Sequence, residues 1–215
     1  MNIIVLVGAG ISTSLGIPDF RSKDIGLYNT LKHNSNNELG LGLDCPEDLF
    51  CIEFFKDNPT PFYKFAKQLY YPKLNKEKKK NDDNDDKMLL RVYTQNIDGF
   101  ESVAGVSESK IVYCHGSLKQ VKCLRCNNNI DNNDNNDEYP QQQEQHDNTN
   151  YCNGILKPSI TFFGENLSNH VNKRIEYDRQ KVDALIVIGT SLSVAPISKV
   201  IEYLPTNIPR ILINK

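Results

Sequence analysis

A glycine-containing turn near the start of the chain has the residue types that bind phosphate. Gly8 and Gly10 follow an apolar run directly, and Ser12 and Thr13 come next. Glycine at the end of a strand lets backbone N–H groups approach a pyrophosphate at the N-terminus of a helix, and Ser12 or Thr13 can cap that helix. The pattern predicts nucleotide binding, although a tight turn without a ligand explains these residues alone equally well.

Polar side chains that could do acid–base chemistry follow two further apolar runs. Gln95, Asn96 and Asp98 come after the run 88–93, and His115 comes after the run 111–113. Ligands bind at the carboxyl ends of the strands in open α/β sheets, and an imidazole accepts a proton near neutral pH. His115 is therefore a candidate general base. A structural histidine and ordinary turn-forming residues are the alternative explanation.

Cysteines near the middle of the chain form a candidate metal site. Cys123 and Cys126 have the Cys-x-x-Cys spacing of one half of a tetrahedral zinc site, and Cys152 follows within the same region. A thiolate pair of this spacing binds zinc well only when further ligands join it. Any zinc held here is expected to be structural.

Five apolar runs predict the strands that position these residues. Most are rich in Val, Ile or Leu, as is typical of strands that are buried on both faces of a parallel sheet. They are residues 2–7, 88–93, 111–113, 184–188 and 210–213. Helical spacing among aromatic residues in 54–69, with a turn and helix start at 58–61, alternates with these runs. Together they predict an α/β fold.

Two polar segments interrupt this pattern. Residues 75–87 and 127–150 contain almost no large apolar side chains, so they cannot offset the entropy cost of ordering. Both are predicted to be disordered or loop-like inserts. The first also has the lysine and glutamate content of a charged helix, but its asparagine and aspartate residues favour a solvated loop.

Composition excludes several classes of function. The 25 basic residues nearly balance the 27 acidic ones, so direct binding to nucleic acid is not expected. The first apolar run lacks a basic region before it and is interrupted by glycines, so it predicts neither a secretion signal nor a membrane span. We expect a soluble, intracellular protein whose six cysteines are thiols or metal ligands rather than disulfides.

Five motifs in order resemble those of the sirtuins, the NAD-dependent protein deacylases. The first joins the glycine turn to a Pro-Asp-Phe-Arg sequence in residues 8–22, "GAGISTSLGIPDFRS". The others are "YTQNIDGFE" (93–101), "CHGS" (114–117), "KPSITFFGE" (157–165) and "GTSLSVAP" (189–196). The third glycine is Gly16 rather than residue 13, and no acidic residue closes a second strand, which disfavours a hydride-transferring dehydrogenase.

The resemblance implies a fold and an activity. The fold is a Rossmann-like parallel sheet with helices on both faces, formed by residues 1–116 and 157–215, with a small zinc-ribbon-type insert at 117–156. The activity is NAD-dependent removal of acetyl or related acyl groups from lysine in histone or non-histone proteins. NAD is consumed as a co-substrate, which yields nicotinamide, deacylated lysine and O-acyl-ADP-ribose. No membrane partner is implied.

The resemblance also assigns roles to residues. His115 would be the base that deprotonates a ribose hydroxyl after the acyl-lysine oxygen has displaced nicotinamide, and Asn96 would line the same pocket. Phe20 would shield the reactive ribose carbon from water. The implied cofactor-binding residues are Gly8, Ala9, Gly10, Ser12, Asp19, Phe20, Arg21, Gln95, Asn96, Asp98, Gly189, Thr190, Ser191 and Asn214.

The resemblance extends to the substrate and metal sites. The "TFFGE" and "GTSLSV" sequences offer backbone edges on which an extended substrate peptide adds as a strand. In the zinc site, Cys152 takes the place of one ligand of the second pair, but Thr149 stands where that pair usually has its other cysteine. Thr149 is a poor zinc ligand, so His146 or an acidic residue of the same loop would replace it. The predicted ligands are Cys123, Cys126, Cys152 and His146; without a fourth ligand the site is incomplete or empty.

Departures from the family pattern keep other functions open. The charged segment 75–87 stands where sirtuins carry a Pro-Thr…His pattern, and sirtuins continue beyond Ile213 and Asn214, so we expect a shortened member. Such a chain could bind NAD, ADP-ribose or acyl-lysine without turnover. A second alternative is a protein ADP-ribosyltransferase, which activates the same cofactor for a different nucleophile.

Overall fold

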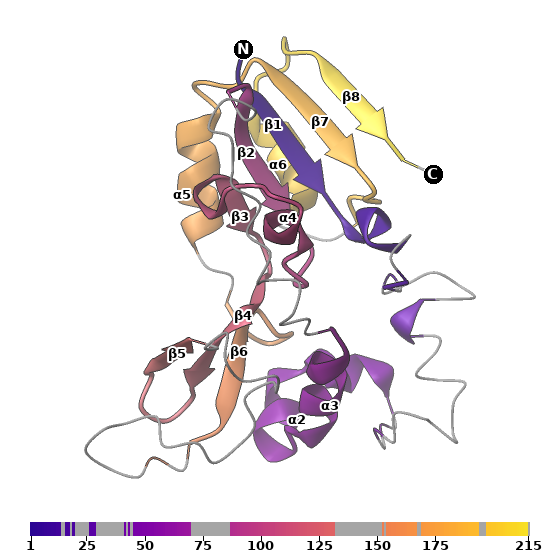
Figure 1. The fold of residues 1–215 in the computed structure, drawn as a ribbon, viewed down its shortest axis with the longest axis vertical. Coiled ribbons are helices and arrows are strands. Elements are labelled where there is room, and N and C mark those ends of the chain that lie inside the picture. Colours follow the sequence, from indigo (N-terminus) through magenta and orange to yellow (C-terminus); the bar gives the residue numbers. More distant parts are fainter. Residues whose placement is uncertain are drawn as a thin grey trace. The chain divides into compact units, whose positions relative to one another are not determined.

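The computed structural model describes residues 1–13, 16–17, 19, 26–28, 41, 43, 45–69, 87–131, 152, 154–166, 169–193 and 197–214. Contacts within the chain divide it into two compact units (Figure 1). The first consists of residues 1–19, 78–115 and 167–215, and the second of residues 20–77 and 116–166. The boundaries 117–156 that the sequence suggests for a zinc-binding insert stay a prediction.

A parallel five-stranded sheet forms the centre of the first unit. Its order is β3-β2-β1-β7-β8, and each neighbouring pair is parallel. The strands are β1 (Ile3–Val7), β2 (Leu89–Thr94), β3 (Ile111–Tyr113), β7 (Ala184–Ile188) and β8 (Arg210–Ile213). All five predicted apolar runs are therefore strands, and the predicted α/β class with a parallel sheet is confirmed.

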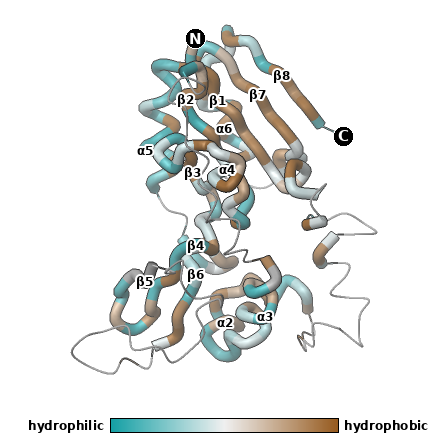
Figure 2. The backbone as a smooth tube through the Cα atoms, in the orientation of Figure 1, coloured by the Kyte–Doolittle hydropathy of each residue, from teal (hydrophilic) through white to brown (hydrophobic). Residues whose placement is uncertain are grey.

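Two helices pack on one face of this sheet. They are α5 (Asn169–Asp178) and α6 (Ile197–Tyr203). The buried side chains of the two helices and of alternate strand residues form one apolar cluster, which includes Ile4, Leu6, Leu185, Val187, Val171, Ile175, Ile197 and Val200. The strands β1 and β7 are correspondingly brown along most of their length in Figure 2. This cluster fixes the strands whose carboxyl ends carry the predicted site.

Strand β8 differs from the expectation that every strand would be buried on both faces. It pairs only with β7 and forms one edge of the sheet (Figure 1). All four of its side chains are exposed, and Leu212 is 67% exposed. An edge strand has a neighbour on one side only, and in the described part of the chain neither of its faces is covered. The prediction of burial is therefore wrong for β8.

A buried ion pair joins β2 to α5. The guanidinium of Arg91 donates to both carboxylate oxygens of Asp178, through Nε at 2.9 Å and Nη2 at 3.3 Å. The hydroxyl of Tyr93 donates to the same carboxylate at 2.7 Å. The side chain of Asp178 is fully buried and that of Arg91 is 10% exposed.

Removing one partner of this pair is expected to leave a buried charge unpaired. We expect Asp178→Ala to lower the free energy of unfolding by about 3–5 kcal/mol, measured by urea denaturation. The matched control is Glu176→Ala, which removes an exposed ion pair with Arg179 and should change stability by less than about 1 kcal/mol. Equal effects of the two changes would contradict the role given to the buried pair.

The second unit combines a three-stranded antiparallel sheet with short helices. The sheet has the order β5-β4-β6, formed by β4 (Gly116–Cys123), β5 (Asn129–Asp131) and β6 (Leu156–Ile160). Helices α2 (Ile52–Asp57) and α3 (Thr60–Leu69) follow a 3₁₀ turn at Pro46–Phe50. The aromatic spacing in 54–69 thus forms the predicted helices, and Asn58 ends α2 as the predicted turn requires.

The predicted polar inserts have different outcomes. Strand β5 pairs with β4, so the prediction of a loop-like segment is wrong for Asn129–Asp131, where Ile130 lies opposite Val121 and the pairing satisfies backbone groups. The rest of the prediction for residues 75–87 and 127–150 falls almost entirely outside the described residues. Among the helices that the structure describes, none combines the length and apolar character needed to cross a membrane.

Aromatic side chains make the core of the second unit. Phe55, Phe62 and Phe162 pack with ring centroids 4.9–5.6 Å apart. Buried Tyr63 donates its hydroxyl to the carbonyl oxygen of Leu156 at 2.6 Å, which joins α3 to β6. This core holds the "TFFGE" sequence in place, because Phe162 belongs to both.

Candidate functional site

The glycine turn after β1 is a 3₁₀ turn, Ala9–Ile11, packed against the end of β7. The N–H groups of Gly8 and Gly10 donate to the carbonyl oxygens of Ile188 and Gly189, at 3.1 and 2.8 Å. A Cβ atom at residue 8 would lie 2.6 Å from the Cβ of Thr190, and one at residue 10 would lie 2.7 Å from the Cα of Gly189. Glycine is therefore required here by the close approach of two loops. These two N–H groups are engaged within the protein, contrary to the expected use of glycine N–H groups for phosphate.

Ser12 and Thr13 do not cap the turn Ala9–Ile11, and their predicted role at the start of a following helix depends on residues outside the described ones and stays a prediction. Gly8 is the N-terminal cap of the turn and has no side chain to cap it, while Ser12 lies at its C-terminal end. The buried hydroxyl of Ser12 instead donates to the carboxylate of Asp98 at 3.0 Å. This hydroxyl connects the turn to the loop after β2.

Three hydrogen bonds fix the position of Asn96. Its side-chain amide donates to the carbonyl oxygen of Gly8 at 3.2 Å and to the hydroxyl of Ser12 at 3.3 Å. Its backbone N–H donates to the hydroxyl of Thr94 at 3.1 Å. Thr94 in turn donates to the buried carboxylate of Glu101 in helix α4 (Phe100–Val103). Sequence reasoning missed Thr94 and Glu101, because nothing in their spacing signals a contact across the turn.

Asp98 occupies the same loop as Asn96. Its carboxylate accepts hydrogen bonds from the N–H of Phe100 and the hydroxyl of Ser12, each at 3.0 Å. Burial raises the pKa of Asp98, although these two donors oppose the rise. The loop thus presents a fixed carboxylate beside the amide of Asn96.

His115 lies in the turn after β3, one residue beyond Cys114, and its ring contacts Gln95. Its Nδ1 atom is 3.0 Å from the carbonyl oxygen of Gln95. Because a carbonyl oxygen only accepts hydrogen bonds, Nδ1 carries the hydrogen, and the neutral ring keeps its lone pair on Nε2. The Nε2 atom is buried and has no partner among the described residues. Burial lowers the pKa of His115, against a smaller opposing effect of the Gln95 carbonyl.

Gln95 links His115 to the loop after β7. The hydroxyl of Thr190 donates to the side-chain oxygen of Gln95 at 3.1 Å and accepts the N–H of Leu192 at the same distance. The side-chain nitrogen of Gln95 is buried without a partner in the described part of the chain. Two buried polar atoms, Nε2 of His115 and Nε2 of Gln95, are therefore available to a ligand.

The remaining predicted cofactor residues lie in the loops after several strands, and two of them fall outside the described residues. Ala9 begins the turn after β1, and Gly189 donates its N–H to the carbonyl oxygen of Ile213 at 3.0 Å. Asn214 follows directly after Ile213, so it lies at the same carboxyl edge of the sheet. Ser191 is exposed and accepts a hydrogen bond from Ser193. Asp19 is half-buried, whereas Phe20 and Arg21 lie outside the described residues.

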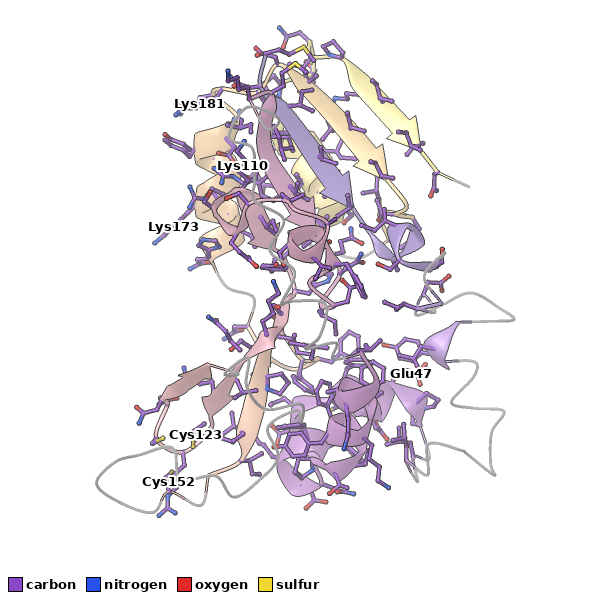
Figure 3. All side chains as sticks on the ribbon, in the orientation of Figure 1. Glu47, Lys110, Cys123, Cys152, Lys173 and Lys181 are labelled. Atoms are coloured by element: carbon purple, nitrogen blue, oxygen red, sulfur yellow. The ribbon has the colours of Figure 1, made fainter. Side chains whose placement is uncertain are left out.

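Three of the four predicted metal ligands come together in the second unit. The sulfur atoms of Cys123, Cys126 and Cys152 all lie within 4.8 Å of one another, and Figure 3 shows Cys123 beside Cys152. The Cys123 and Cys152 sulfurs are 3.6 Å apart, close to the roughly 3.7 Å expected for two thiolates on one tetrahedral zinc ion. His146 lies outside the described residues.

The surroundings of Cys123 favour a thiolate. Burial would raise the pKa of Cys123, but the N–H groups of Cys126 and Arg125, together with the neighbouring thiols, lower it to about 6. A Cβ atom at residue 154 would lie 2.3 Å from the Cys123 sulfur. Gly154 therefore allows the chain beside Cys152 to approach the first cysteine pair. The donor set fits zinc, and the three thiols leave one position of a tetrahedron for another ligand.

Comparisons with known proteins agree with this arrangement. Residues 8–196 match the Sir2 family. The chain is 39% identical to the NAD-dependent histone deacetylase SIR2 of Candida glabrata, over 99% of its length and 48% of that relative. It is 38% identical to the NAD-dependent protein deacetylase sir-2.1 of Caenorhabditis briggsae, over 100% of its length and 34% of that relative.

A human protein is similarly related. The NAD-dependent protein deacetylase sirtuin-1 of Homo sapiens is 41% identical, over 99% of this chain and 28% of the relative. The chain thus spans about half or less of the length of these curated relatives. The matched residues include all five motifs and every described residue of the site except Asn214.

Proposed function

The chain belongs to the Sir2 family, and from this premise we propose that it is an NAD-dependent protein-lysine deacetylase. The observation that carries the proposal is the pair of buried, unpartnered nitrogens of His115 and Gln95 at the carboxyl edge of the parallel sheet. Buried polar groups without partners are rare in proteins, and a bound ligand or water would give these two nitrogens the partners that they lack. Acetyl is the expected acyl group, with histone or non-histone proteins as substrates, in an intracellular setting.

The residues of this edge fit NAD. Asn96, Asp98, Gln95 and Thr190 offer amide, carboxylate and hydroxyl groups, which suit the ribose hydroxyls and the nicotinamide amide. Gly189, Ser191 and Asn214 are proposed to contact the phosphate and adenosine parts of the cofactor, together with Asp19, Phe20 and Arg21. When bound, NAD supplies a ribose carbon with a good leaving group. The chain's own residues then have to hold the acyl oxygen against that carbon and keep water away.

His115 is proposed to take a proton. Its Nδ1–H is fixed on the Gln95 carbonyl, so its Nε2 can accept a hydrogen from a ribose hydroxyl that lies within hydrogen-bond distance. Asn96 is proposed to orient the reacting ribose, because its amide is already fixed by Gly8 and Ser12. A preorganised amide loses little freedom when the substrate binds.

Zinc is proposed to be structural. Cys123, Cys126 and Cys152 would hold it, with His146 or an acidic residue of the same loop as the fourth ligand. The role of the ion would be to join β4 to the segment that leads into β6.

A direct assay tests the proposed activity. Incubation with NAD and an acetyl-lysine peptide should release nicotinamide and deacetylated peptide in equal amounts. Nicotinamide release without peptide would instead indicate NAD hydrolysis or ADP-ribosyl transfer. Binding of NAD or of the peptide without any release would support the non-catalytic alternative.

The burial of His115 predicts the pH dependence of the reaction. Only the neutral ring can accept a proton, and a lowered pKa keeps the ring neutral to lower pH. We expect kcat/KM for the peptide to be flat through neutral pH and to fall only below the ordinary histidine pKa of about 6.5. The pH profile of kcat/KM measures this, since it reports groups of the free enzyme. An acidic limb centred above that value would contradict the assignment.

A further inference from the structure

Lys157 is a buried cation that the proposed reaction does not use. Its side chain is 8% exposed, at the second residue of β6 in the second unit. Its ammonium group donates to the carbonyl oxygens of Ile160 at 2.6 Å and Pro158 at 3.1 Å, and it lies 2.9 Å from the carboxylate of Glu165. The same ammonium lies 4.6 Å from the centre of the Phe162 ring. Every one of these partners belongs to the segment 157–165.

These contacts fix the turn that follows β6. The Glu165 carboxylate that binds Lys157 also accepts the N–H of Phe162 at 2.8 Å, and the N–H of Glu165 donates back to the carbonyl oxygen of Phe162 at 3.1 Å. Lys157 therefore holds both ends of the turn Phe162–Glu165. A buried ammonium with this many acceptors has its cost of desolvation offset, but an apolar side chain of the same length would often be no less stable there. Geometry rather than stability is thus the better explanation for a cation at this position.

The other side of the turn is occupied as well. Phe163 donates its N–H to the carbonyl oxygen of Phe50 at 2.7 Å and accepts the N–H of Ile52 at 3.0 Å. The backbone groups of Phe162 and Phe163 are thus all engaged within the protein, so within the turn Phe162–Glu165 strand addition by a peptide can begin only at Gly164. The ring of Phe163 is 53% exposed, and it is the one large apolar side chain exposed among the described residues of this unit.

We propose that Lys157 is a positioning residue for the acyl-lysine peptide, because it fixes the turn Phe162–Glu165 in the conformation that presents Gly164 and the Phe163 ring. The inference rests on the proposed deacetylase function. Peptide addition to a backbone edge depends on the exact orientation of that edge. Losing the ammonium would let the turn change its conformation, which should weaken peptide binding and leave NAD binding unaffected.

The experiment compares two buried cations. Lys157→Met removes the ammonium but keeps a side chain of similar length, and Arg91→Met does the same for the buried ion pair of the first unit. For each variant, KM for the acetyl-lysine peptide, KM for NAD and the thermal midpoint are measured. Anisotropy of a fluorescent acetyl-lysine peptide without NAD gives its Kd independently of turnover.

We expect Lys157→Met to raise KM and Kd for the peptide by about tenfold or more, with KM for NAD within about twofold of the wild type. Arg91→Met should lower the thermal midpoint without changing either peptide constant. Glu165→Gln, whose side chain is 27% exposed, should raise peptide KM less than Lys157→Met does. The Glu165→Gln variant provides the comparison with the wild type if Lys157→Met does not fold.

Three results would overturn the inference. Unchanged peptide constants in a folded Lys157→Met protein, or in Glu165→Gln where only that variant folds, would exclude positioning by this ion pair. An equal rise in KM for peptide and for NAD would indicate general damage to the fold. A wild-type protein that neither binds nor deacetylates the peptide would overturn the proposed function and this inference with it. If the wild-type protein binds the peptide without turnover, the comparison of peptide Kd between wild type and variants still decides whether Lys157 is a positioning residue.

Discussion

His115→Ala should lower kcat for the acetyl-lysine peptide by about 10²–10⁴-fold, the range that a general base contributes. The loss is expected because no other described side chain places an unpartnered basic nitrogen at the carboxyl edge of the sheet. NAD binding should largely survive, since the side chains of Asn96, Asp98 and Gln95 are held by Gly8, Ser12, Phe100 and Thr190. The imidazole ring contacts only the backbone carbonyl of Gln95 among these three residues. Nicotinamide release and NAD binding by calorimetry measure the two effects separately.

A second histidine provides the control for this variant. His170 is exposed in the first turn of α5, and His170→Ala should leave kcat within about twofold of the wild type. Undiminished deacetylation by His115→Ala would contradict the assignment of His115 as the general base. Equal losses of NAD binding and of kcat would instead show that the ring has a structural role, because the variant would then already be impaired in holding NAD before the chemical step.

Strand positions in the sheet could be predicted from the sequence because each run is mostly apolar and consists largely of Val, Ile and Leu. β1 and β7 illustrate this, since Leu6 and Leu185 are fully buried in one cluster with α5 and α6. The exposure of β8 could not be predicted from its own residues. Arg210–Ile213 is as apolar as the other runs. Edge position does not explain the difference, because β3 forms the other edge of the sheet and its Ile111 and Val112 are buried. The side chains of β8 meet solvent because no described element covers its faces.

The site was predictable where chemistry follows a strand and unpredictable where it depends on contacts across loops. His115 and Asn96 were found because polar residues that end parallel strands meet at one edge. The use of Gly8 to pack against Thr190 could not be inferred, because it depends on which loop lies beside the turn. The same holds for Thr94 and Glu101, which support the backbone of Asn96 through a hydrogen bond within the core.

The metal cluster is the part of the site that could be predicted least fully from the sequence. Cys-x-x-Cys spacing identifies one pair, but twenty-five residues separate Cys126 from Cys152, and only folding brings the third sulfur to the pair. Strand β6 and Gly154 account for that approach: the start of β6 pairs with the end of β4, where Leu156 lies opposite Cys123, and Gly154 leaves room for the Cys123 sulfur. Geometry of this kind favours a bound ion over three isolated thiols, which predicts a large effect when one thiol is removed.

Cys123→Ser should reduce the zinc content of the purified protein from about one ion per chain to well below half an ion. Cys123 is the central ligand to remove, since it is buried, has a lowered pKa and lies 3.6 Å from the Cys152 sulfur. Structural zinc contributes binding free energies of about 10–16 kcal/mol in small zinc modules, so the variant should also unfold at a lower temperature. Cys45→Ser, which removes an exposed thiol outside the cluster, is the matched control and should retain the metal. Metal analysis by mass spectrometry and thermal melts, with and without a chelator, measure both effects.

The loss of metal should also affect peptide binding. Because Cys123 ends β4 and pairs with Leu156 at the start of β6, the loss of metal should loosen the strand that carries Lys157, and peptide affinity should fall with the zinc content. Wild-type protein that is free of metal and no less stable after chelation would remove the zinc site from the account.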